Sequence, residues 1–348
     1  MGSCAGTPGP AALTGRPGPG EWTLGREADI RAVLADARFT VLPPGPGGPP
    51  GTVAWLRASV SRFAGGARHR ARRALIESEL RQLEPAALGR AARQLAVSQL
   101  AGAGRPGDRA DVMSVVARPV PAAALAAAMG LAGPLAVAAA VNTVAAAYFP
   151  GADARRERQA DPAVAWLVAA LAGAGPAAPG GTGPRPGGPA AGLDLAVARI
   201  AIMVQACEAT AGLIGTALHA LQDAPQTGPA WPTSELLAHT LRYRPPAGKL
   251  RRVAAGPAQL GGRRIRPGDQ VTCDIESAGR DPQAGPGAGP GLAFGSGIRP
   301  CPGPAHALAL AAGVIDAVRE RCVLRPGAPV AYEASATRIP GRLDVLLR

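Results

Sequence analysis

The segment Phe294–Gly303 (F-G-S-G-I-R-P-C-P-G) places a single cysteine in a glycine-rich loop directly before a predicted helix. The dipole and free N–H groups at the amino end of that helix favour a negative charge, so we expect Cys301 to be a thiolate. A thiolate here is either a catalytic nucleophile or the ligand of a single metal centre. A nucleophile needs a base, and the histidine near Cys301 is His306, one turn along the same helix.

The cysteines as a set indicate neither a disulfide framework nor a zinc site. They are odd in number, widely spaced and without a C-x-x-C pair. Their positions are Cys4, Cys207, Cys273, Cys301 and Cys322.

The composition supports a folded core and argues against nucleic-acid binding. The 47 glycines and 37 prolines make up almost a quarter of the 348 residues and by themselves suggest disorder, but 47% of the residues are hydrophobic. Only 3% are aromatic, so stacking platforms for single-stranded nucleic acid are few. All but one of the 37 basic residues are arginines, a bias typical of GC-rich codons, and the net charge of +13 favours acidic partners.

Hydrophobic periodicity predicts a mainly α protein with small β-sheets. Between Leu193 and Asp223 the apolar residues lie on every face, which indicates a central buried helix. Strand patterns appear late, as a hairpin over Ala258–Ile265 and a short strand over Gln270–Ile275. The other predicted helices are Arg26–Phe39, most of Val53–Phe149, Leu236–Arg242 and Pro304–Cys322.

Domain boundaries and location follow from the breaker-rich segments. We expect residues 1–20 to be disordered, residues 173–192 to form a loop, and residues 21–348 to form a single domain. No secretory signal is recognised at the start. The uncharged stretch 119–152 is long enough to span a bilayer, but Pro121, Pro134 and Asn142 interrupt it, which favours two buried helices. The prediction is a cytoplasmic protein without a membrane span.

The cysteine loop resembles the haem-binding loop of the cytochrome P-450 family, F-x-x-G-x-R-x-C-x-G. Every fixed position of that pattern is present: Phe294, Gly297, Arg299, Cys301 and Gly303. Later landmarks of the family follow in the right order, among them Leu241–Pro246 (L-R-Y-R-P-P) and Ser277–Pro282 (S-A-G-R-D-P). The resemblance implies the helical prism of the soluble bacterial type and a haem-thiolate monooxygenase.

The resemblance also assigns roles to single residues. Cys301 would be the axial ligand of the iron in haem b, within the loop shaped by Gly297 and Gly303. Arginine forks suit the haem carboxylates, and Arg68 stands where the family usually has a histidine. The cofactor-binding positions are Arg68, His69, Arg72, Arg252, Phe294, Gly297, Arg299 and Gly303.

The central helix departs from the family in its oxygen-binding motif, Gln205–Ala211 (Q-A-C-E-A-T-A). The family has an acid followed by a threonine that relays protons. Glu208 keeps the acid, Ala209 replaces the threonine, and Thr210 lies one residue on, turned by about 100°. Glu208 and Thr210 are the catalytic candidates.

A second departure concerns the short helix before Pro245. The family pairs glutamate and arginine three residues apart, and here His239 stands three residues before Arg242. Glu235 lies seven positions before Arg242, too far to substitute by simple geometry. The partner arginine before the haem loop has no counterpart in residues 283–293. Haem binding is therefore better supported than ordinary oxygen activation.

Three hypotheses remain open. The first is a P-450-like monooxygenase that oxidises an apolar small molecule in bacterial secondary metabolism, as a monomer supplied by a ferredoxin and ferredoxin reductase. The second uses the same haem for peroxide chemistry, cyclisation, rearrangement or nitrene-type transfer, as Ala209 suggests. The third is a degenerate, non-catalytic partner protein, as His239 suggests.

Overall fold

The computed structural model describes residues 14–15, 20–149, 152–173, 189–223, 231–284, 290–325, 329–333 and 337–348. These residues form two compact units. Met1–Leu42 and Ala238–Cys301 form the sheet unit, and Pro43–Leu237 with Pro302–Arg348 forms the helical unit. The expected disorder of residues 1–20 and the expected loop 173–192 fall mostly outside the described residues, and the single domain over 21–348 stays a prediction.

The sheet unit is built on a five-stranded sheet of order β1-β2-β8-β5-β3, in which β2 and β8 are parallel and the other pairs antiparallel. The predicted hairpin is present as β6 and β7, which close over two glycines at positive φ. The strands are β1 Thr14–Gly15, β2 Glu21–Leu24, β3 Phe39–Thr40, β5 Lys249–Ala254, β6 Ala258–Leu260, β7 Arg263–Ile265 and β8 Gln270–Asp274; the helices within the unit are α1 Glu27–Ala35, α10 Ile275–Gly279 and the 3-10 turn η2 Pro282–Ala284.

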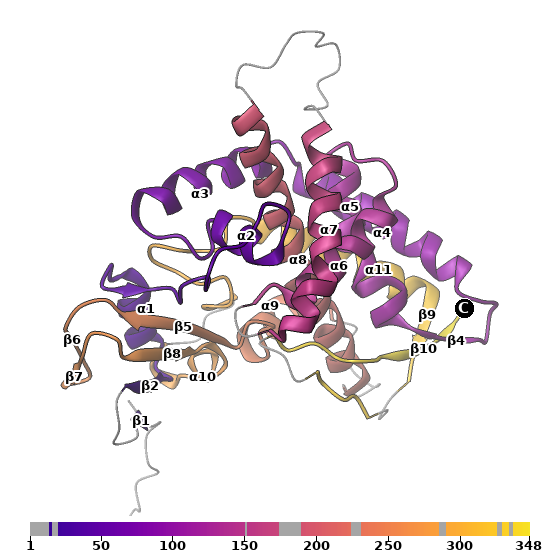
Figure 1. Ribbon diagram of the computed structural model, residues 1–348. Helices are drawn as coiled ribbons and strands as arrows, with labels where there is room; N and C mark the ends of the chain where they lie inside the picture. Colours follow the sequence, from indigo (N-terminus) through magenta and orange to yellow (C-terminus); the bar gives the residue numbers. More distant parts are fainter. Residues whose placement is uncertain are drawn as a thin grey trace, which may run out of the picture. The chain divides into compact units, whose positions relative to one another are not determined.

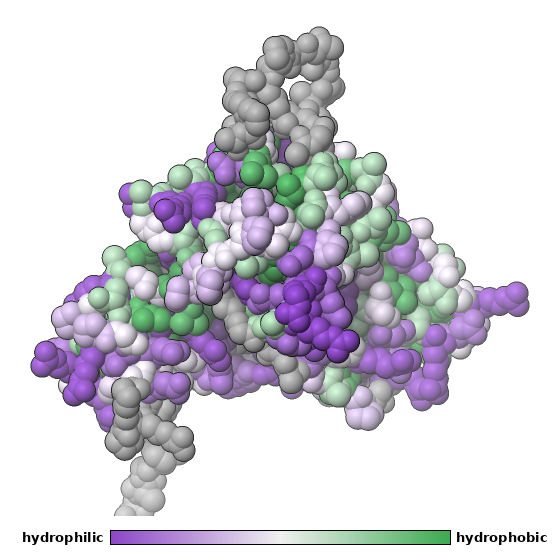
Figure 2. Space-filling model, viewed as in Figure 1, coloured by the Kyte–Doolittle hydropathy of each residue, from purple (hydrophilic) through white to green (hydrophobic). Residues whose placement is uncertain are grey.

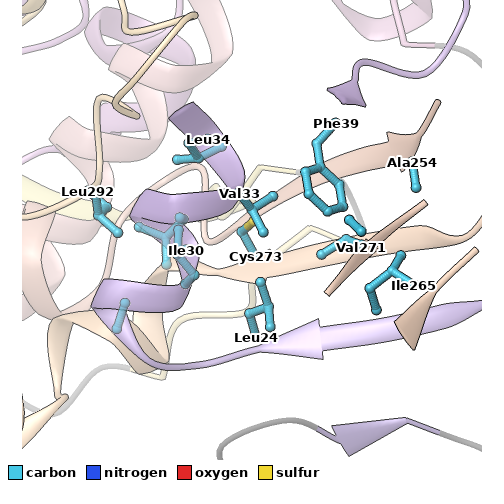
Figure 3. Packing of buried hydrophobic residues seen from close by; sticks show 13 residues of the cluster. Leu24, Ile30, Val33, Leu34, Phe39, Ala254, Ile265, Val271, Cys273 and Leu292 are labelled. Carbon is cyan, nitrogen blue, oxygen red and sulfur yellow. The ribbon is translucent and has the colours of Figure 1, made fainter. Parts of the chain in front are cut away.

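Helix α1 packs its apolar face on this sheet. Ile30, Val33 and Leu34 recur at helical spacing and are at most 3% exposed. In Figure 3 their side chains lie beside Leu24 and Cys273, which come from the neighbouring strands β2 and β8. The β2 strand was not predicted from the sequence, because its pairing with β8 joins segments about 250 residues apart.

The helical unit surrounds the long helix α8, and in Figure 1 this helix lies behind α7 and α6. It packs against α3, α5, α6, α7 and α11. The helices are α2 Val53–Ser59, α3 Gly66–Arg81, α4 Pro85–Gly102, the π-helix η1 Met113–Ala117, α5 Pro119–Ala128, α6 Pro134–Ala147, α7 Ala154–Gly173, α8 Pro189–Asp223, α9 Thr233–Tyr243, which ends in the sheet unit, and α11 Pro304–Arg321; a small sheet has the order β4 Arg109–Asp111, β10 Asp344–Leu347, β9 Cys322–Leu324.

The apolar segments of the sequence become buried helices. The uncharged stretch 119–152 contains α5 and α6, as predicted, and α8 is buried on every side over residues 211–218. One stretch of α8, Gly192–Gln222, is long and apolar enough to cross a membrane, but 78% of its most apolar window is buried inside the structure, as in a core helix. Buried Arg199 on α8 also binds Glu79 of α3, with 2.6 Å between Nε and Oε2.

Helices α4 and α11 approach closely at two glycines. A Cβ atom on Gly313 of α11 would lie 2.2 Å from the carbonyl oxygen of Gly89 on α4. A Cβ atom on Gly89 would lie 3.0 Å from the carbonyl oxygen of Ala309. The first distance is far inside a van der Waals contact with rigid backbone, so this crossing depends on glycine at position 313.

We predict that Gly313→Ala lowers the free energy of unfolding by about 1–3 kcal/mol, because the added methyl group overpacks the crossing of α4 and α11. The matched control is Gly102→Ala on α4, where a Cβ atom has no neighbour within 4 Å. The control should be neutral or stabilising by up to about 1 kcal/mol. Denaturant unfolding measures both, and equal stability of the two variants would contradict the packing argument.

Candidate active site

The Cys301 loop is a closed turn that depends on glycine. The backbone N–H of Cys301 donates to the carbonyl oxygen of Phe294 at 2.7 Å, which closes the segment. Gly295 and Gly297 have φ values of 68° and 66°, a region that favours glycine. A Cβ atom on Gly297 would lie 2.2 Å from the carbonyl oxygen of Leu34 in α1. The loop therefore lies directly against the end of α1, with no room for a side chain at position 297.

Cys301 differs from the other cysteines of the described chain in being accessible. Its side chain is half-buried, whereas Cys207, Cys273 and Cys322 are buried. Burial raises the pKa of Cys207 to about 12 and the pKa values of Cys273 and Cys322 to about 11. Buried protonated thiols of this kind are inert. Among these four, Cys301 is thus the cysteine placed to act as a ligand or nucleophile.

His306 does not have the contacts of a base for Cys301. Its Nε2 atom lies 3.0 Å from the carbonyl oxygen of Leu80 and 2.9 Å from that of Leu83. Carbonyl oxygens only accept, so Nε2 carries the proton and donates to the carboxyl end of α3. His306 therefore anchors α11 to α3 through Nε2, and a base role would fall to its other ring nitrogen, Nδ1, which has no hydrogen-bond partner among the described residues. A ligand role for Cys301 needs no base.

Two of the arginines predicted to bind the cofactor lie in the same unit as Cys301. Arg299 belongs to the loop itself, and Arg252 lies on β5 with 8% of its surface exposed. The Nη1 atom of Arg252 donates to the carbonyl oxygen of Arg251 at 2.9 Å. The hydroxyl oxygen of Ser296, also in the loop, is buried without a hydrogen-bond partner. The loop thus carries an accessible thiol, which can ligate a metal as its thiolate, an arginine, which can bind carboxylates, and a hydroxyl without a hydrogen-bond partner. These groups suit a metal cofactor that carries negative charge.

The predicted cofactor-binding residues of α3 differ in exposure and in their hydrogen-bond contacts. Arg68 is exposed and His69 is buried. Arg72 donates from Nη1 to the carbonyl oxygens of Ala58 and Val60, at 2.8 and 3.1 Å, and so closes the carboxyl end of α2. Burial, followed by the charge of Arg68, lowers the pKa of Arg72.

Arg73 belongs to the same segment of α3 and forms an ion pair with Glu77 one turn on, with 2.7 Å between its Nε atom and Oε1 of Glu77.

Neighbouring residues of the Gln205–Ala211 motif on α8 differ in exposure. Ala209 is exposed, while Thr210 is 2% exposed and its hydroxyl oxygen has no hydrogen-bond partner. The exposed position of the motif therefore carries a methyl group. The hydroxyl one residue on is turned into the protein, as expected for a rotation of about 100° per residue.

Glu208 belongs to a charged cluster with Arg118 and Glu333, which form an ion pair. Burial raises the pKa of Glu208, the charge of Arg118 opposes the shift, and Glu333 adds to it. The segment that carries Glu333 is fixed to α8, because the hydroxyl of Tyr332 lies 2.8 Å from Nδ1 of His219. Arg118 and Glu333 are each about 90 or more residues from Glu208 in the chain, so no sequence signal could have found them.

The short helix α9 is stabilised without a carboxylate at position 239. The ring of His239 packs on that of Tyr243, with 4.8 Å between centroids. Arg280 donates to the carbonyl oxygen of Tyr243 at 2.7 Å and so caps the helix. A Cβ atom on Gly279 would lie 1.8 Å from the carbonyl oxygen of Arg242, so α10 lies hard against the end of α9.

Comparison with solved structures places this arrangement in a known fold. CalO2 superposes with a TM-score of 0.74 at 22% identity, covering 94% of this chain and 90% of CalO2. P450BioI, solved with an acyl carrier protein that carries hexadec-9Z-enoic acid, gives 0.72 at 19% identity, with 95% and 93% covered. EryK from S. erythraea, a cytochrome P450, gives 0.69 at 19% identity, with 97% and 92% covered. The chain has the cytochrome P450 fold.

The likeness is one of structure rather than of sequence. No protein-family model matches the chain, and no curated protein does either. The mainly α architecture with small sheets predicted from the sequence is confirmed, as is the resemblance to bacterial P450 structures. The roles assigned to individual residues stay predictions. Because P450 structures of this kind imply a haem cofactor, the donors around Cys301 are the residues to test against haem.

We predict that Glu208→Gln gains stability relative to the wild type as the pH rises from about 4 to about 8. Because the pKa of Glu208 is raised in the folded state, its contribution is present below the unfolded pKa and is lost as the pH rises through the folded pKa. The glutamine variant escapes that loss. Urea unfolding at several pH values measures the difference.

Glu84→Gln is the control with the opposite sign. The backbone N–H groups of Ala86 and Ala87 lower the pKa of Glu84, so its contribution is lost as the pH falls. This variant should be less stable than the wild type at neutral pH and equal to it in acid. Parallel pH profiles for Glu208→Gln and the wild type would contradict the assignment.

Proposed function

We propose that this protein is a haem-thiolate oxidoreductase of the cytochrome P450 type that oxidises an apolar small molecule. The observation that carries the proposal is the Cys301 loop. It offers an accessible thiol directly before α11, in a turn that the glycines at 295 and 297 shape.

The cofactor would be haem b, held in the sheet unit by Cys301 as axial ligand and by Arg299 and Arg252 toward its carboxylates. Phe294, Gly297 and Gly303 would shape the loop around the sulfur. When bound, a haem-thiolate centre supplies the electron push that favours cleavage of an O–O bond. Binding roles for Arg68, His69 and Arg72 in the helical unit belong to the same proposal.

The chain's own residues decide which oxidative chemistry is accessible. Glu208 holds its proton more tightly than an exposed glutamate does, because burial raises its pKa. Ala209 places a methyl group at the exposed position where a hydroxyl would relay protons. Thr210 cannot take over from its buried position. We therefore propose as the second candidate function a haem-thiolate reaction that needs no hydroxyl relay, such as peroxide use, cyclisation, rearrangement or nitrene-type transfer.

The substrate class and partners are proposed from chemistry and from the neighbours. EryK has been solved with erythromycin B, and P450 RauA with a biosynthetic intermediate of aurachin RE. We propose a small molecule of bacterial secondary metabolism as substrate. The net charge of +13 suits an acidic ferredoxin, with its reductase, as electron donor to a cytoplasmic monomer.

The decisive experiment is the spectrum of the reduced, CO-bound protein. We expect a stoichiometric haem content and a thiolate-type Soret shift that Cys301→Ser abolishes. The control Cys273→Ser removes a buried thiol of the same unit and should leave the shift intact. Absence of haem would favour the non-catalytic partner, and a thiolate-type shift in Cys301→Ser would overturn the ligand assignment.

Ala209→Thr tests the missing relay. If ordinary oxygenation is impaired by the lost hydroxyl, coupling of electron consumption to product should rise, by up to roughly 100-fold. Thr210→Ala is the matched control and should leave coupling unchanged, because its hydroxyl is buried away from the exposed face. Unchanged coupling in Ala209→Thr, together with turnover on peroxide, would favour the second candidate function.

A further inference from the structure

Helix α7 carries a cluster of arginines that the fold does not use. Arg155, Arg156 and Arg158 are exposed, and their guanidinium groups form no hydrogen bond or ion pair within the part of the chain that the structure describes. The nearby carboxylates have other contacts. Glu157 binds the buried Arg57 at 2.7 Å, and Asp153 accepts from the backbone N–H of Arg155.

The position of this cluster is unfavourable for folding. The amino end of a helix carries a partial positive charge, which stabilises acidic side chains and repels cations. Two of the arginines stand in the first turn of α7, where an acid would be the stabilising choice. Helix stability therefore does not account for their presence, whereas binding of an anionic surface would.

Helix α7 has a buried side, a side that faces α2 and an outer side that faces solvent. One side, with Ala160, Val164 and Leu167, is buried in the helical unit. A second side faces α2, where Asp161 accepts from the backbone N–H of Val53 at 2.8 Å. The outer side is left to solvent, and Figure 2 shows a dense hydrophilic patch over the amino end of the helix.

An exposed tryptophan lies on the same outer side. Trp166 is 45% exposed, in a chain with four tryptophans. The residues Arg155, Gln159, Pro162 and Trp166 follow one another at spacings of four, three and four, so they form one solvent-facing stripe of α7. At 1.5 Å per residue the stripe is about 16 Å long. Tryptophan and arginine are the residue types most enriched among interface residues that dominate binding energy.

We propose that the outer face of α7, formed by Arg155, Arg156, Arg158 and Trp166, docks an acidic protein. The positive charge of the arginines complements a negatively charged partner. It therefore favours acidic proteins and orients them as they approach. Trp166 supplies an apolar anchor at the other end of this face. The surface is independent of the haem proposal, because it uses no residue of the cysteine loop.

A membrane surface fits this face less well than a protein does. A helix that lies in a lipid interface inserts a broad apolar side. The apolar side of α7 is buried in the protein, and its outer stripe offers one large apolar residue, Trp166. The face can therefore contact acidic groups but has little to insert between lipids.

The test measures binding of the full-length protein to two acidic probes, an acyl carrier protein and a [2Fe–2S] ferredoxin, by calorimetry at low and moderate salt. We expect one of them to bind, more weakly as salt rises. The triple variant Arg155→Glu, Arg156→Glu, Arg158→Glu and the single variant Trp166→Ala should each weaken binding about 10-fold or more. Because glutamates suit the amino end of a helix, the triple variant should fold at least as well as the wild type.

The matched control reverses three exposed arginines elsewhere, at Arg105, Arg109 and Arg264, with the same change in net charge. It should weaken binding by less than about 3-fold if the α7 face is specific. An equal loss in both triple variants would overturn the proposal in favour of general attraction to a basic protein. Failure of both probes to bind would also overturn it. Binding to vesicles of phosphatidylcholine and phosphatidylserine that the α7 variants abolish, without protein binding, would assign the face to a membrane instead.

Discussion

The carbonyl oxygen of Leu34 leaves no space for a side chain at position 297, and the candidate site depends on this contact. It holds the cysteine loop against the end of α1, whose opposite face is fixed to the sheet by Ile30 and Val33. The thiol of Cys301 is thereby supported by a packed hydrophobic cluster rather than by a free loop. Ligand loops gain precision from rigid supports of this kind, so the accessibility of one cysteine is a consequence of backbone packing.

Helix α8 is both the buried centre of the helical unit and the element that carries the candidate catalytic residues. Most of its surface is buried, and its buried arginine, Arg199, is neutralised by Glu79. In the middle of this helix Ala209 is exposed, and Glu208 is held among Arg118 and Glu333. The proton affinity of Glu208 is therefore set by elements distant in the chain. The exposed position of the motif carries a methyl group and no hydroxyl.

Much of the fold could be predicted because local patterns and tertiary contacts agree. The helical periodicity of residues 304–322, the double glycine at 261–262, and the prolines within 119–152 correspond to observed elements. The helix predicted over residues 26–39 is present but ends at Ala35, and Phe39 lies in β3. The strand Glu21–Leu24 could not be predicted, because its parallel partner β8 lies about 250 residues away. The same reason hides the contact of Glu208 with Arg118 and Glu333.

The sequence by itself selected the Cys301 loop as the candidate ligand loop, since five residues within ten positions match the pattern of such a loop. It also determined that Ala209 stands where a hydroxyl is expected. The tertiary structure decided which cysteine is accessible, that His306 is bonded to the carboxyl end of α3, and that Arg72 closes α2. It also decided that the guanidinium groups of Arg155, Arg156 and Arg158 on α7 face solvent without partners among the described residues. Residue types and their spacing predict which reactions a segment could support. Burial and hydrogen-bond partners depend on segments that are far apart in the chain, and only folding brings these segments together.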